Sequence, residues 1–342
     1  MKNILVISFV FILAACSERQ ATFRLNGETM GTTYTVVASQ KNISVDEQEI
    51  REAIEETLSD VDSKLSNWAP LSEISRFNAA KHTNPVPISR DLALVLSATF
   101  EVHEQSSGHF DVTLGPLIEL WGFGVRQPDS PVPADAEISK ALEYVGLREL
   151  VELGEEGTSL RKVHPEVSIN LAPLAKGYGI DAVAQTLTKL GFTNYMVEIG
   201  GDLVVSGLNP EGQQWHIGIE RPEAIVRTVE QVVVLSDAGM ATSGDYRNYF
   251  EDDDIRYSHI LDVKTGRPVT HKTASVTVVA ENAMMADAWA TALLAMGRPE
   301  GMKIAKKFNL AAFFIERDVA LDSAQEFVVF ASPRFNALNE QQ

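Results

Sequence analysis

Two kinds of hydrophobic spacing divide this chain into expected helices and strands. Apolar residues recur at intervals of three and four over 44–67, which predicts an amphipathic helix. Ser44 and Glu47 are spaced as a capping box at its start. Its apolar stripe is Ile50, Ile54, Leu58, Val61 and Leu65. Further helices are expected over 89–108, within 115–124, and over 138–145, 173–190, 283–296 and 300–308.

Alternating apolar and polar positions predict strands elsewhere. The segments 22–39 and 194–207 each read as strand, glycine turn and strand. Five later strands are expected at WHIGIE, VEQVVVLS, AGMATSG, YSHILDV and ASVTVVA, and AAFFIE and FVVFAS close the sheet. Because the strands gather in the second half and do not alternate strictly with helices, the pattern favours an α+β fold with mixed or antiparallel sheets flanked by helices.

The first residues, MKNILVISFVFILAAC, predict export. One lysine precedes an apolar run that is too short to span a bilayer stably, which is typical of a signal peptide over 1–15. LAAC also fits a lipobox, in which Cys16 is lipidated and becomes the new N-terminus; a plain signal with a chance cysteine is the alternative. Cys16 is the only cysteine, which favours lipidation. We therefore expect a tether over 16–21 and one domain over 22–335.

Charge narrows the choice of partners. The chain has 342 residues, of which 45% are hydrophobic and 22% charged, and a formal net charge of -18. Such a surface repels nucleic acid, so no nucleic-acid partner is expected. It also repels phosphate compounds, so a site for one would need a metal ion or local positive charge.

Two distant segments carry candidate ligands for such a site. In NAMMADAWATALLAMG, Asp287 and Thr291 are one helical turn apart and offer two hard oxygens, which suit Mg²⁺; helix capping and a hydroxyl–carbonyl bond are the alternatives. In NLAPLAKGYGIDAVAQTL, small residues surround Lys176 at a helix start, which suits a phosphate. A tight helix–sheet contact with an exposed lysine is the alternative for the second segment.

Several other residues are candidates with structural alternatives. Trp68 could stack on a planar ring or belong to the core. Asp111 stands beside His109 and Phe110 in HFDVTLGP. His259 and Asp262 fall on one expected strand, and His259 could equally be a hydrogen-bonded core histidine.

The order of these motifs along the chain is more specific to one protein family than any single motif. ETMGTTY, SEISRFN, FDVTLGPL, NLAPLAKGYGID, EIGGD, TSGDY, SHILDVKTG and ADAWATAL, in this order from about residue 22 to 330, resemble the ApbE family of FAD:protein FMN transferases, which are periplasmic lipoproteins. The resemblance implies a T-fold-like α+β chain with an FAD cleft. It also implies that FMN is transferred from FAD to a threonine of another protein, with release of AMP and with Mg²⁺ at the pyrophosphate.

Carried over to this sequence, the resemblance implies specific contacts. The metal ligands would be Asp287, Thr291 and the carbonyl of Pro173. The residues that would border FAD are Met30, Trp68, His109, Phe110, Asp111, Asn170, Lys176 and Leu261. The family more often has Tyr in place of Trp68, Asp in place of Asn170, and a small residue in place of Pro173.

Charge and proton transfer suggest the catalytic roles. His259 is the expected base for the acceptor threonine, because histidine titrates near neutral pH. Asp262 would orient it or would instead cap the KTG turn. Two other functions stay open: an FAD pyrophosphatase that gives FMN and AMP, and a flavin-binding lipoprotein without catalysis.

The resemblance also implies a partner and a location. The expected acceptor is a membrane redox-complex subunit with a Ser/Asp-Gly-Ala-Thr-like stretch. The expected location is the periplasmic face of the inner membrane, held by the lipid anchor; Ser17, which follows Cys16 in place of an aspartate retention signal, leaves the outer membrane as the alternative.

Overall fold

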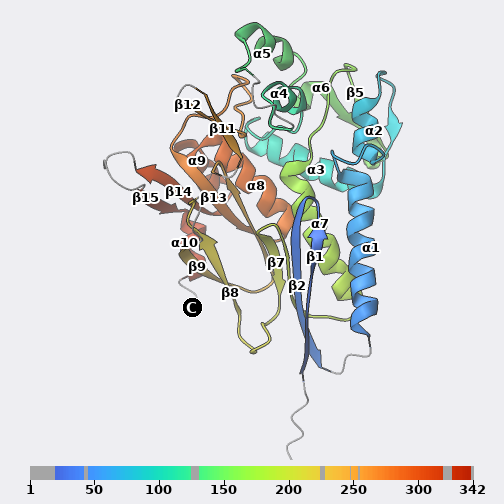
Figure 1. The fold of residues 1–342 in the computed structure, drawn as a ribbon, viewed down its shortest axis with the longest axis vertical. Coiled ribbons are helices and arrows are strands. Elements are labelled where there is room, and N and C mark those ends of the chain that lie inside the picture. The colour runs from blue at the N-terminus through green and yellow to red at the C-terminus, as the bar shows by residue number, and fades with distance from the viewer. Residues whose placement is uncertain are drawn as a thin grey trace, which may run out of the picture.

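An eight-stranded sheet forms the centre of the molecule (Figure 1), in a computed structural model that describes residues 20–41, 45–124, 131–223, 228–246, 248–252, 255–318 and 326–339. Its order is β1 (Gln20–Thr29), β2 (Thr32–Lys41), β6 (Asn194–Ile199), β7 (Asp202–Ser206), β10 (Ala238–Gly244), β13 (Thr273–Ala280), β14 (Ala311–Asp318) and β15 (Glu326–Ala331). Every neighbouring pair is antiparallel. The expected α+β arrangement is therefore confirmed.

The β1–β2 hairpin runs along one edge of this sheet. Thr29 pairs with Thr32 at the turn, and Gln20 pairs with Lys41 at the opposite end. The turn residue Met30 has φ 50°, in the left-handed region that non-glycine residues seldom adopt. Because β1 begins at Gln20, the last two residues of the range expected as a tether already belong to the strand; Cys16 and the expected signal over 1–15 lie outside the described residues.

Helices α1 (Glu47–Leu65), α7 (Ala172–Lys189) and α8 (Ala283–Met296) lie along one face of the sheet, and α3 (Arg90–Gln105) packs against these helices. All five residues of the expected α1 stripe are buried. The side chain of Asp46 caps α1 by accepting from Gln48 N–H, so the expected capping box at Glu47 is wrong; Ser44 lies outside the described residues. Helix α3 begins at the Ser89 cap as expected.

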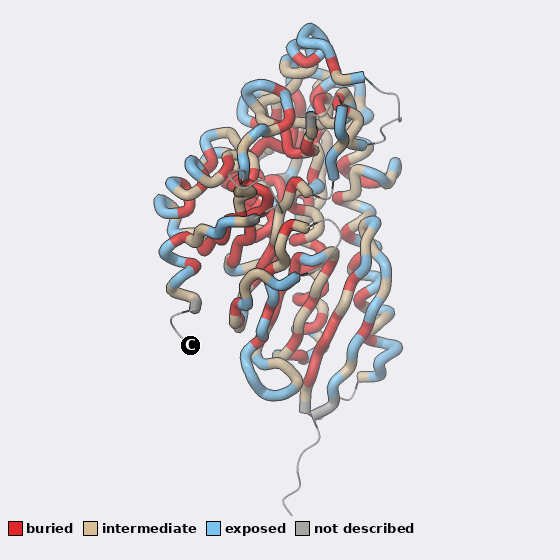
Figure 2. The backbone as a smooth tube through the Cα atoms, turned by 60° about the vertical axis from the view of Figure 1, so that its left-hand side comes forward, coloured by how far each residue is buried: buried red, intermediate tan, exposed pale blue. Residues whose placement is uncertain are grey.

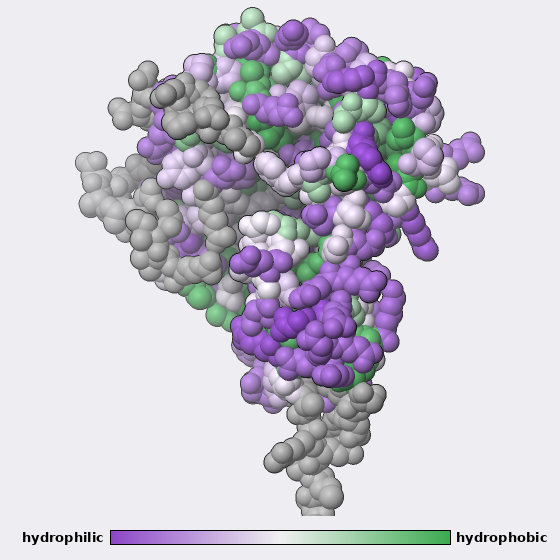
Figure 3. Space-filling model, turned by 45° about the vertical axis from the view of Figure 1, so that its right-hand side comes forward, coloured by the Kyte–Doolittle hydropathy of each residue, from purple (hydrophilic) through white to green (hydrophobic). Residues whose placement is uncertain are grey.

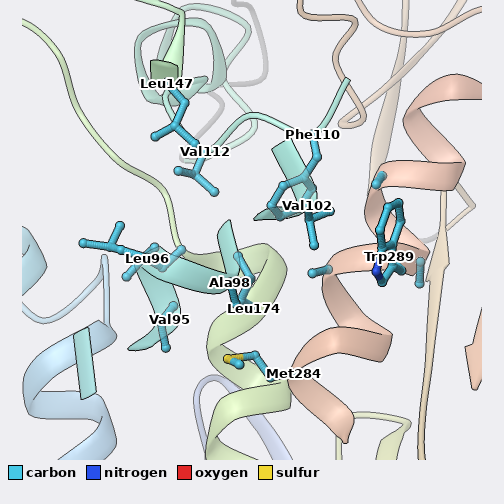
Figure 4. Packing of buried hydrophobic residues seen from close by; sticks show 14 of the residues in the cluster. Val95, Leu96, Ala98, Val102, Phe110, Val112, Leu147, Leu174, Met284 and Trp289 are labelled. Carbon is cyan, nitrogen blue, oxygen red and sulfur yellow. The ribbon is translucent and has the colours of Figure 1, made fainter. Parts of the chain in front are cut away.

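The largest apolar cluster joins three of these helices. Leu174 of α7 and Met284 and Trp289 of α8 lie near Val95 and Val102 of α3 (Figure 4). Each fully buried side chain of this size contributes about 1.5–3 kcal/mol of transfer free energy. Figure 2 shows buried residues running through the strands and through the helices beside them. This packing fixes the relative position of α7 and α8, which both carry candidate site residues.

The opposite face of the sheet is covered by a hairpin and a short helix. The hairpin consists of β8 (Trp215–Glu220) and β9 (Val229–Leu235), and the helix is α10 (Pro333–Asn339). Trp215, Val233 and Phe335 belong to the apolar cluster on this side. The sheet is therefore buried on both faces, which explains why its central strands read as apolar runs.

Smaller elements surround one end of the sheet. The helices are α2 (Glu73–Ala79), α4 (Gly115–Leu120), α5 (Asp135–Leu142), α6 (Leu147–Leu150) and α9 (Arg298–Lys307), with a 3₁₀ turn η1 (Glu155–Gly157). The strands are β3 (Val86–Pro87), β4 (Val151–Leu153) and β5 (Ser159–Lys162) in one small sheet and β11 (Tyr249–Asp252) and β12 (Ile255–Ser258) in another. The expected helix over 138–145 instead starts at Asp135, because Glu137 accepts from Ala134 N–H and so starts it earlier.

The expected strand over 257–263 is largely wrong. Strand β12 ends at Ser258. Between Ser258 and the start of β13, the described residues make only an isolated bridge, which joins Leu261 to Pro268. The backbone of Asp262 is held instead by the following turn, where its N–H donates to Arg267 and its carbonyl accepts from Gly266 N–H. His259 and Asp262 therefore do not occupy alternate positions of one strand.

Hydrophilic residues dominate the face shown in Figure 3, where hydrophobic residues form small separate groups. This distribution agrees with the net charge of -18. None of the described helices combines the length and apolar character needed to cross a bilayer.

Candidate active site at the start of α7

Helices α7 and α8 approach one another closely at Gly177. A Cβ atom at this position would lie 2.5 Å from the Ala283 carbonyl oxygen and 2.6 Å from Met284 Cα. Only glycine allows two backbones to come this near. The small residues in the α7 sequence thus serve a tight contact, and that contact is between two helices from distant parts of the chain.

Asp287 of α8 lies at this contact. Its side chain is buried, with 4% of the residue exposed, and Oδ2 accepts from Gly177 N–H at 3.3 Å. Burial raises the pKa of Asp287 to about 8; Lys176 and the Gly177 N–H lower it, and Asp202 raises it. A carboxyl group that is this reluctant to ionise gains most from a nearby cation.

The metal ligands that the resemblance implied all border this contact. The N–H of an α-helical residue points toward the carbonyl four residues earlier, so Gly177 N–H and Pro173 C=O belong to one turn, and Asp287 reaches that turn. One turn along α8 from Asp287, Thr291 Oγ1 lies 3.0 Å from Ser243 Oγ of β10. Ser243 was not among the expected ligands.

Lys176 and Asp202 form an ion pair beside Asp287. Lys176 Nζ donates to Asp202 Oδ2, and Asp202 Oδ1 accepts from Thr242 N–H at 3.0 Å. Asp202 is buried and Lys176 is partly exposed, so the ammonium group lies at the boundary between protein and solvent. Lys176 therefore supplies the local positive charge that the net charge of the chain made necessary for an anionic ligand.

Asp181 is a half-buried acidic residue beside the site that the sequence analysis does not single out. Its carboxylate accepts from Ala283 N–H and Met284 N–H, both at 2.9 Å, so it caps the start of α8 from α7. Burial raises its pKa to about 6, and the two N–H groups lower it. The spacing of four between Gly177 and Asp181, which places both on one face of α7, is the signal that could have found it.

The entrance of α7 is held by two asparagines. Asn67 donates to Ile169 C=O at 2.7 Å and accepts from Leu171 N–H at 2.8 Å. Asn78 donates to the same carbonyl and accepts from Ile169 N–H, both at 2.8 Å. The side chain of Asn170 accepts from Ala172 N–H at 2.9 Å. These bonds fix the backbone that leads to Pro173, and Asn170 uses its side-chain oxygen within this loop.

His259 is anchored to a single carbonyl. Its Nδ1 lies 2.9 Å from Asn248 O, and its backbone N–H donates to the same oxygen at 3.2 Å. Burial lowers its pKa, whereas Asp245 raises it. Asp245 follows Ser243 by two residues, so His259 belongs to the same region as Thr291.

The side chain of Asp262 caps the KTG turn, which is one of the two roles expected for it. Its Oδ1 accepts from Lys264 N–H at 2.9 Å and from Thr265 N–H at 2.8 Å, which caps the KTG turn. In the part of the chain that the structure describes, no hydrogen bond joins Asp262 to His259. The catalytic role expected for Asp262 is therefore not supported by its contacts.

Met30 is half-buried, whereas Trp68 is exposed. Met30 packs toward α7, since a Cβ at Gly179 would lie 2.8 Å from its Cε. Trp68 is 72% exposed in the connection between α1 and α2, with its indole near Gly124. Trp68 is thus not a core residue, and its ring is free to stack on a planar ligand.

The remaining candidates divide into accessible and internal groups. His109 is half-buried, and burial and Lys264 lower its pKa. The carboxylate of Asp111 is buried and accepts from Thr113 and from Leu147 N–H. Phe110 and Leu261 are buried in separate apolar clusters. Asp111, Phe110 and Leu261 therefore shape the surrounding backbone rather than offer exposed side chains.

The donor set fits a hard divalent cation. Within the described residues, no three His, Cys, Asp or Glu side chains form a metal-binding group. The expected set differs from such a group because it combines one carboxylate, a hydroxyl and a backbone carbonyl, which are all hard oxygens of the kind Mg²⁺ prefers. The raised pKa of Asp287 supports the fit, since a bound cation would favour its charged form.

Comparison with known proteins agrees with this arrangement. A sequence model of the ApbE family matches residues 30–314. The chain belongs to the ApbE family. The resemblance seen in the order of the motifs is therefore confirmed.

Two relatives named FAD:protein FMN transferase match this ApbE-family chain over most of its length. The Haemophilus influenzae protein is 38% identical over 344 residues, which cover 99% of this chain and 98% of that protein. The Vibrio cholerae protein is 39% identical over 316 residues, with 92% and 94% covered.

Solved structures extend the match to three dimensions. The flavin transferase ApbE from Vibrio cholerae superposes with a TM-score of 0.84 at 36% identity and covers 93% of this chain and 99% of its own. The apo form of the flavinyl transferase ApbE from Pseudomonas stutzeri gives 0.83 at 34% identity, with 93% and 97% covered. The expected ApbE architecture is thus confirmed.

Proposed function

We propose that this chain is an FAD:protein FMN transferase. The observation that carries the proposal is the nearly full-length similarity to proteins of that name. It is supported by Asp287, which accepts from Gly177 N–H next to Lys176 at the start of α7 and stands one helical turn before Thr291 in α8. Lys176 provides positive charge at the edge of the site, and the α7 start provides backbone N–H groups, both of which suit a diphosphate.

The proposed acceptor group is a threonine hydroxyl. Its oxygen attacks the phosphorus on the riboflavin side of FAD, the bond from that phosphorus to the bridging oxygen breaks, and AMP leaves with that oxygen. The hydroxyl proton moves to His259 Nε2, which has no hydrogen-bond partner among the described residues. The lowered pKa of His259 keeps the ring neutral and therefore able to accept this proton.

The proposed metal site consists of Asp287, Thr291 and the Pro173 carbonyl. A magnesium ion held there would supply positive charge against the diphosphate and the departing AMP. In the protein itself, Asp202 keeps Lys176 in place, and Asp181 fixes the start of the helix that carries Asp287. Asp287 must be ionised to bind the ion, so metal affinity should rise with pH.

The proposed FAD contacts come from the rim of the same region. Trp68 offers an exposed ring for stacking, and Met30, His109 and Lys176 are partly accessible. Asn170 and Leu261 contribute through the backbone that they hold, and Phe110 and Asp111 support His109 from within.

The proposed location follows from the N-terminal sequence. Lipidation of Cys16 would tether the domain to the periplasmic face of the inner membrane, within reach of redox-complex subunits that carry a Ser/Asp-Gly-Ala-Thr-like stretch. Ser17 makes the outer membrane the alternative outcome. Mass spectrometry of the purified lipoprotein and membrane fractionation test both points.

A direct assay tests the function. The purified protein is mixed with FAD, Mg²⁺ and a candidate acceptor, and mass spectrometry follows covalent FMN on threonine and the release of AMP. The expected result is one AMP for each FMN attached. Free FMN and AMP without an adduct would indicate a pyrophosphatase, and intact FAD with every acceptor tried would contradict catalysis.

A further inference from the structure

We propose that the buried Arg317–Asp245 ion pair is a positioning device for His259 and acts through the carbonyl of Asn248. The inference rests on the proposed function insofar as His259 is the base, but its structural part concerns the orientation and tautomer of one imidazole ring. Among the described residues, Arg317 bonds to Asp245 and to the Lys272 carbonyl and to no candidate substrate-binding residue, so its role is indirect.

One hydrogen bond fixes the orientation of the His259 ring. A carbonyl oxygen only accepts hydrogen bonds, so the His259 nitrogen 2.9 Å from Asn248 O carries the hydrogen. In the neutral ring, Nε2 is then the acceptor nitrogen. The backbone N–H of His259 donates to the same oxygen at 3.2 Å, so a shift of Asn248 would move both the ring and the main chain.

Asn248 lies between β10 and β11 along the chain. Asp245 directly follows β10, and Asn248 directly precedes β11, which pairs with β12. Asp245 N–H donates to Ala274 C=O at 3.0 Å, and its own C=O accepts from Arg256 Nη2 at 2.8 Å. The Asp245 backbone is therefore fixed to β13 on one side and to β12 on the other.

The ion pair joins Arg317 to Asp245. Arg317 Nη1 lies 2.8 Å from Asp245 Oδ2, and Nη2 lies 2.5 Å from Oδ1. The two side chains are 18% and 10% exposed, so solvent screens the pair weakly. Arg317 is fixed in turn at the end of β14, where its N–H donates to Lys272 C=O. A planar guanidinium that meets both carboxylate oxygens defines direction as well as distance, which a lysine cannot reproduce.

Among the described residues, Asp245 is the charged group whose field acts on His259. Arg256 lies against the Asp245 carbonyl and over the Tyr249 ring, 4.0 Å from its centroid. Phe123 presents an edge-on ring to His259, with 6.4 Å between the centroids. Phe123 thus packs against the imidazole ring, and the Asn248 carbonyl accepts the hydrogen bond from its Nδ1–H.

The test compares Arg317→Met, Arg317→Lys and Asp245→Asn, each in the wild-type and in the His259→Ala background. Arg161→Met is the matched control, because Arg161 also meets both oxygens of a carboxylate, that of Glu152, but in the distant β4–β5 pair. The readouts are the single-turnover rate of FMN transfer, the affinity for FAD and the melting temperature.

The expected result is a rate effect that requires His259. A displacement on the order of 1 Å can slow a positioned reaction by about 100-fold, so Arg317→Met should slow transfer by about 10- to 100-fold with little change in FAD affinity. Arg317→Lys should fall between Arg317→Met and wild type, and Arg161→Met should match wild type. In the His259→Ala background, Arg317→Met should add less than about 3-fold, because coupled residues are not additive.

A spectroscopic readout separates this inference from the proposed function. Nitrogen-15 NMR of the seven histidines, with His259 assigned by its loss in His259→Ala, should show the Nδ1–H tautomer in wild type and exchange between tautomers in Arg317→Met and Asp245→Asn. An unchanged His259 signal in both variants would overturn the positioning role, whatever the wild-type activity. Equal slowing by Arg317→Met in both backgrounds would overturn it as well, and an inactive wild type with the expected spectra would count against the transferase alone.

Discussion

Gly177 N–H donates to the carboxylate of Asp287 at 3.3 Å, across 110 positions of the chain. This bond joins the first turns of α7 to the middle of α8. The α7 turn carries the Pro173 carbonyl and the α8 side carries Thr291, so the whole proposed metal site depends on how closely the two helices approach.

Replacing Asp287 by asparagine should abolish the acceleration of FMN transfer by Mg²⁺. The amide keeps the shape but loses the negative charge that a divalent ion requires. The measurement is the transfer rate over a range of Mg²⁺ concentrations. Glu211→Gln, in the exposed connection between β7 and β8, is the control. A variant that still responds to Mg²⁺ as wild type does would remove Asp287 from the metal site.

Gly177→Ala should separate α7 from α8. The new Cβ would lie 2.5 Å from the backbone oxygen of Ala283, so the start of α8 must move. Overpacking of this kind costs about 1–3 kcal/mol, measurable as a lower free energy of unfolding in urea, and transfer should slow more than this loss explains. In Gly218→Ala of β8 the new Cβ would lie 3.1 Å from the exposed side chain of Val229 and not against backbone, so this variant serves as the control. Equal effects of the two substitutions would contradict the close-contact argument.

Loss of the Asp181 proton should lower the free energy of unfolding as pH rises. Its pKa is raised to about 6, above the ordinary value near 4 of an unfolded chain, so the folded protein holds this proton more tightly. Stability from this group is complete below about pH 4 and is lost as pH rises to about 6, by up to about 3 kcal/mol. The free energy of unfolding of wild type minus that of Asp181→Asn, measured from pH 4 to 7, should decrease across this window. A flat difference would refute the assignment.

Asn78→Ala should loosen the entrance of α7. It removes both hydrogen bonds to Ile169 and leaves the buried N–H of that residue without its partner, at a cost of about 1–3 kcal/mol. Hydrogen exchange at residues 169–175 should become faster, while α10 exchanges as before. Asn336→Ala, on the exposed side of α10, provides the comparison. Unchanged exchange over 169–175 would mean that Asn67 alone holds the loop.

Elements with many residues in one pattern could be predicted from the sequence. The α1 stripe has five buried positions at helical spacing, and α8 has the expected bounds because apolar residues fill it from its asparagine cap to Gly297. Strands β3, β4 and β5 span only two to four residues each, so alternation cannot reveal them. The segment after Ser258 alternates like a strand, but its turn contacts prevail over that pattern.

The residues of the candidate site also differ in whether a local sequence pattern could reveal them. Spacing along one helix joined Asp287 to Thr291, and local composition pointed to Lys176. Pairings across the fold had no local signal: Ser243 meets Thr291 from β10, and Asn248 meets His259 from a turn. The sequence leaves Asp262 two roles, to orient His259 or to cap the KTG turn, and only the three-dimensional contacts show that its side chain caps the turn.

The β1–β2 hairpin has a consequence for where the enzyme could work. Its turn residue Met30 packs against Gly179 of α7, next to the site, whereas Gln20 lies at the other end of the ten-residue strand β1. A strand of this length extends roughly 33 Å. The turn beside the site and the end of β1 that leads toward Cys16 are therefore separated by the length of the hairpin, so under the proposed lipidation the anchor would join the domain at the end remote from Met30.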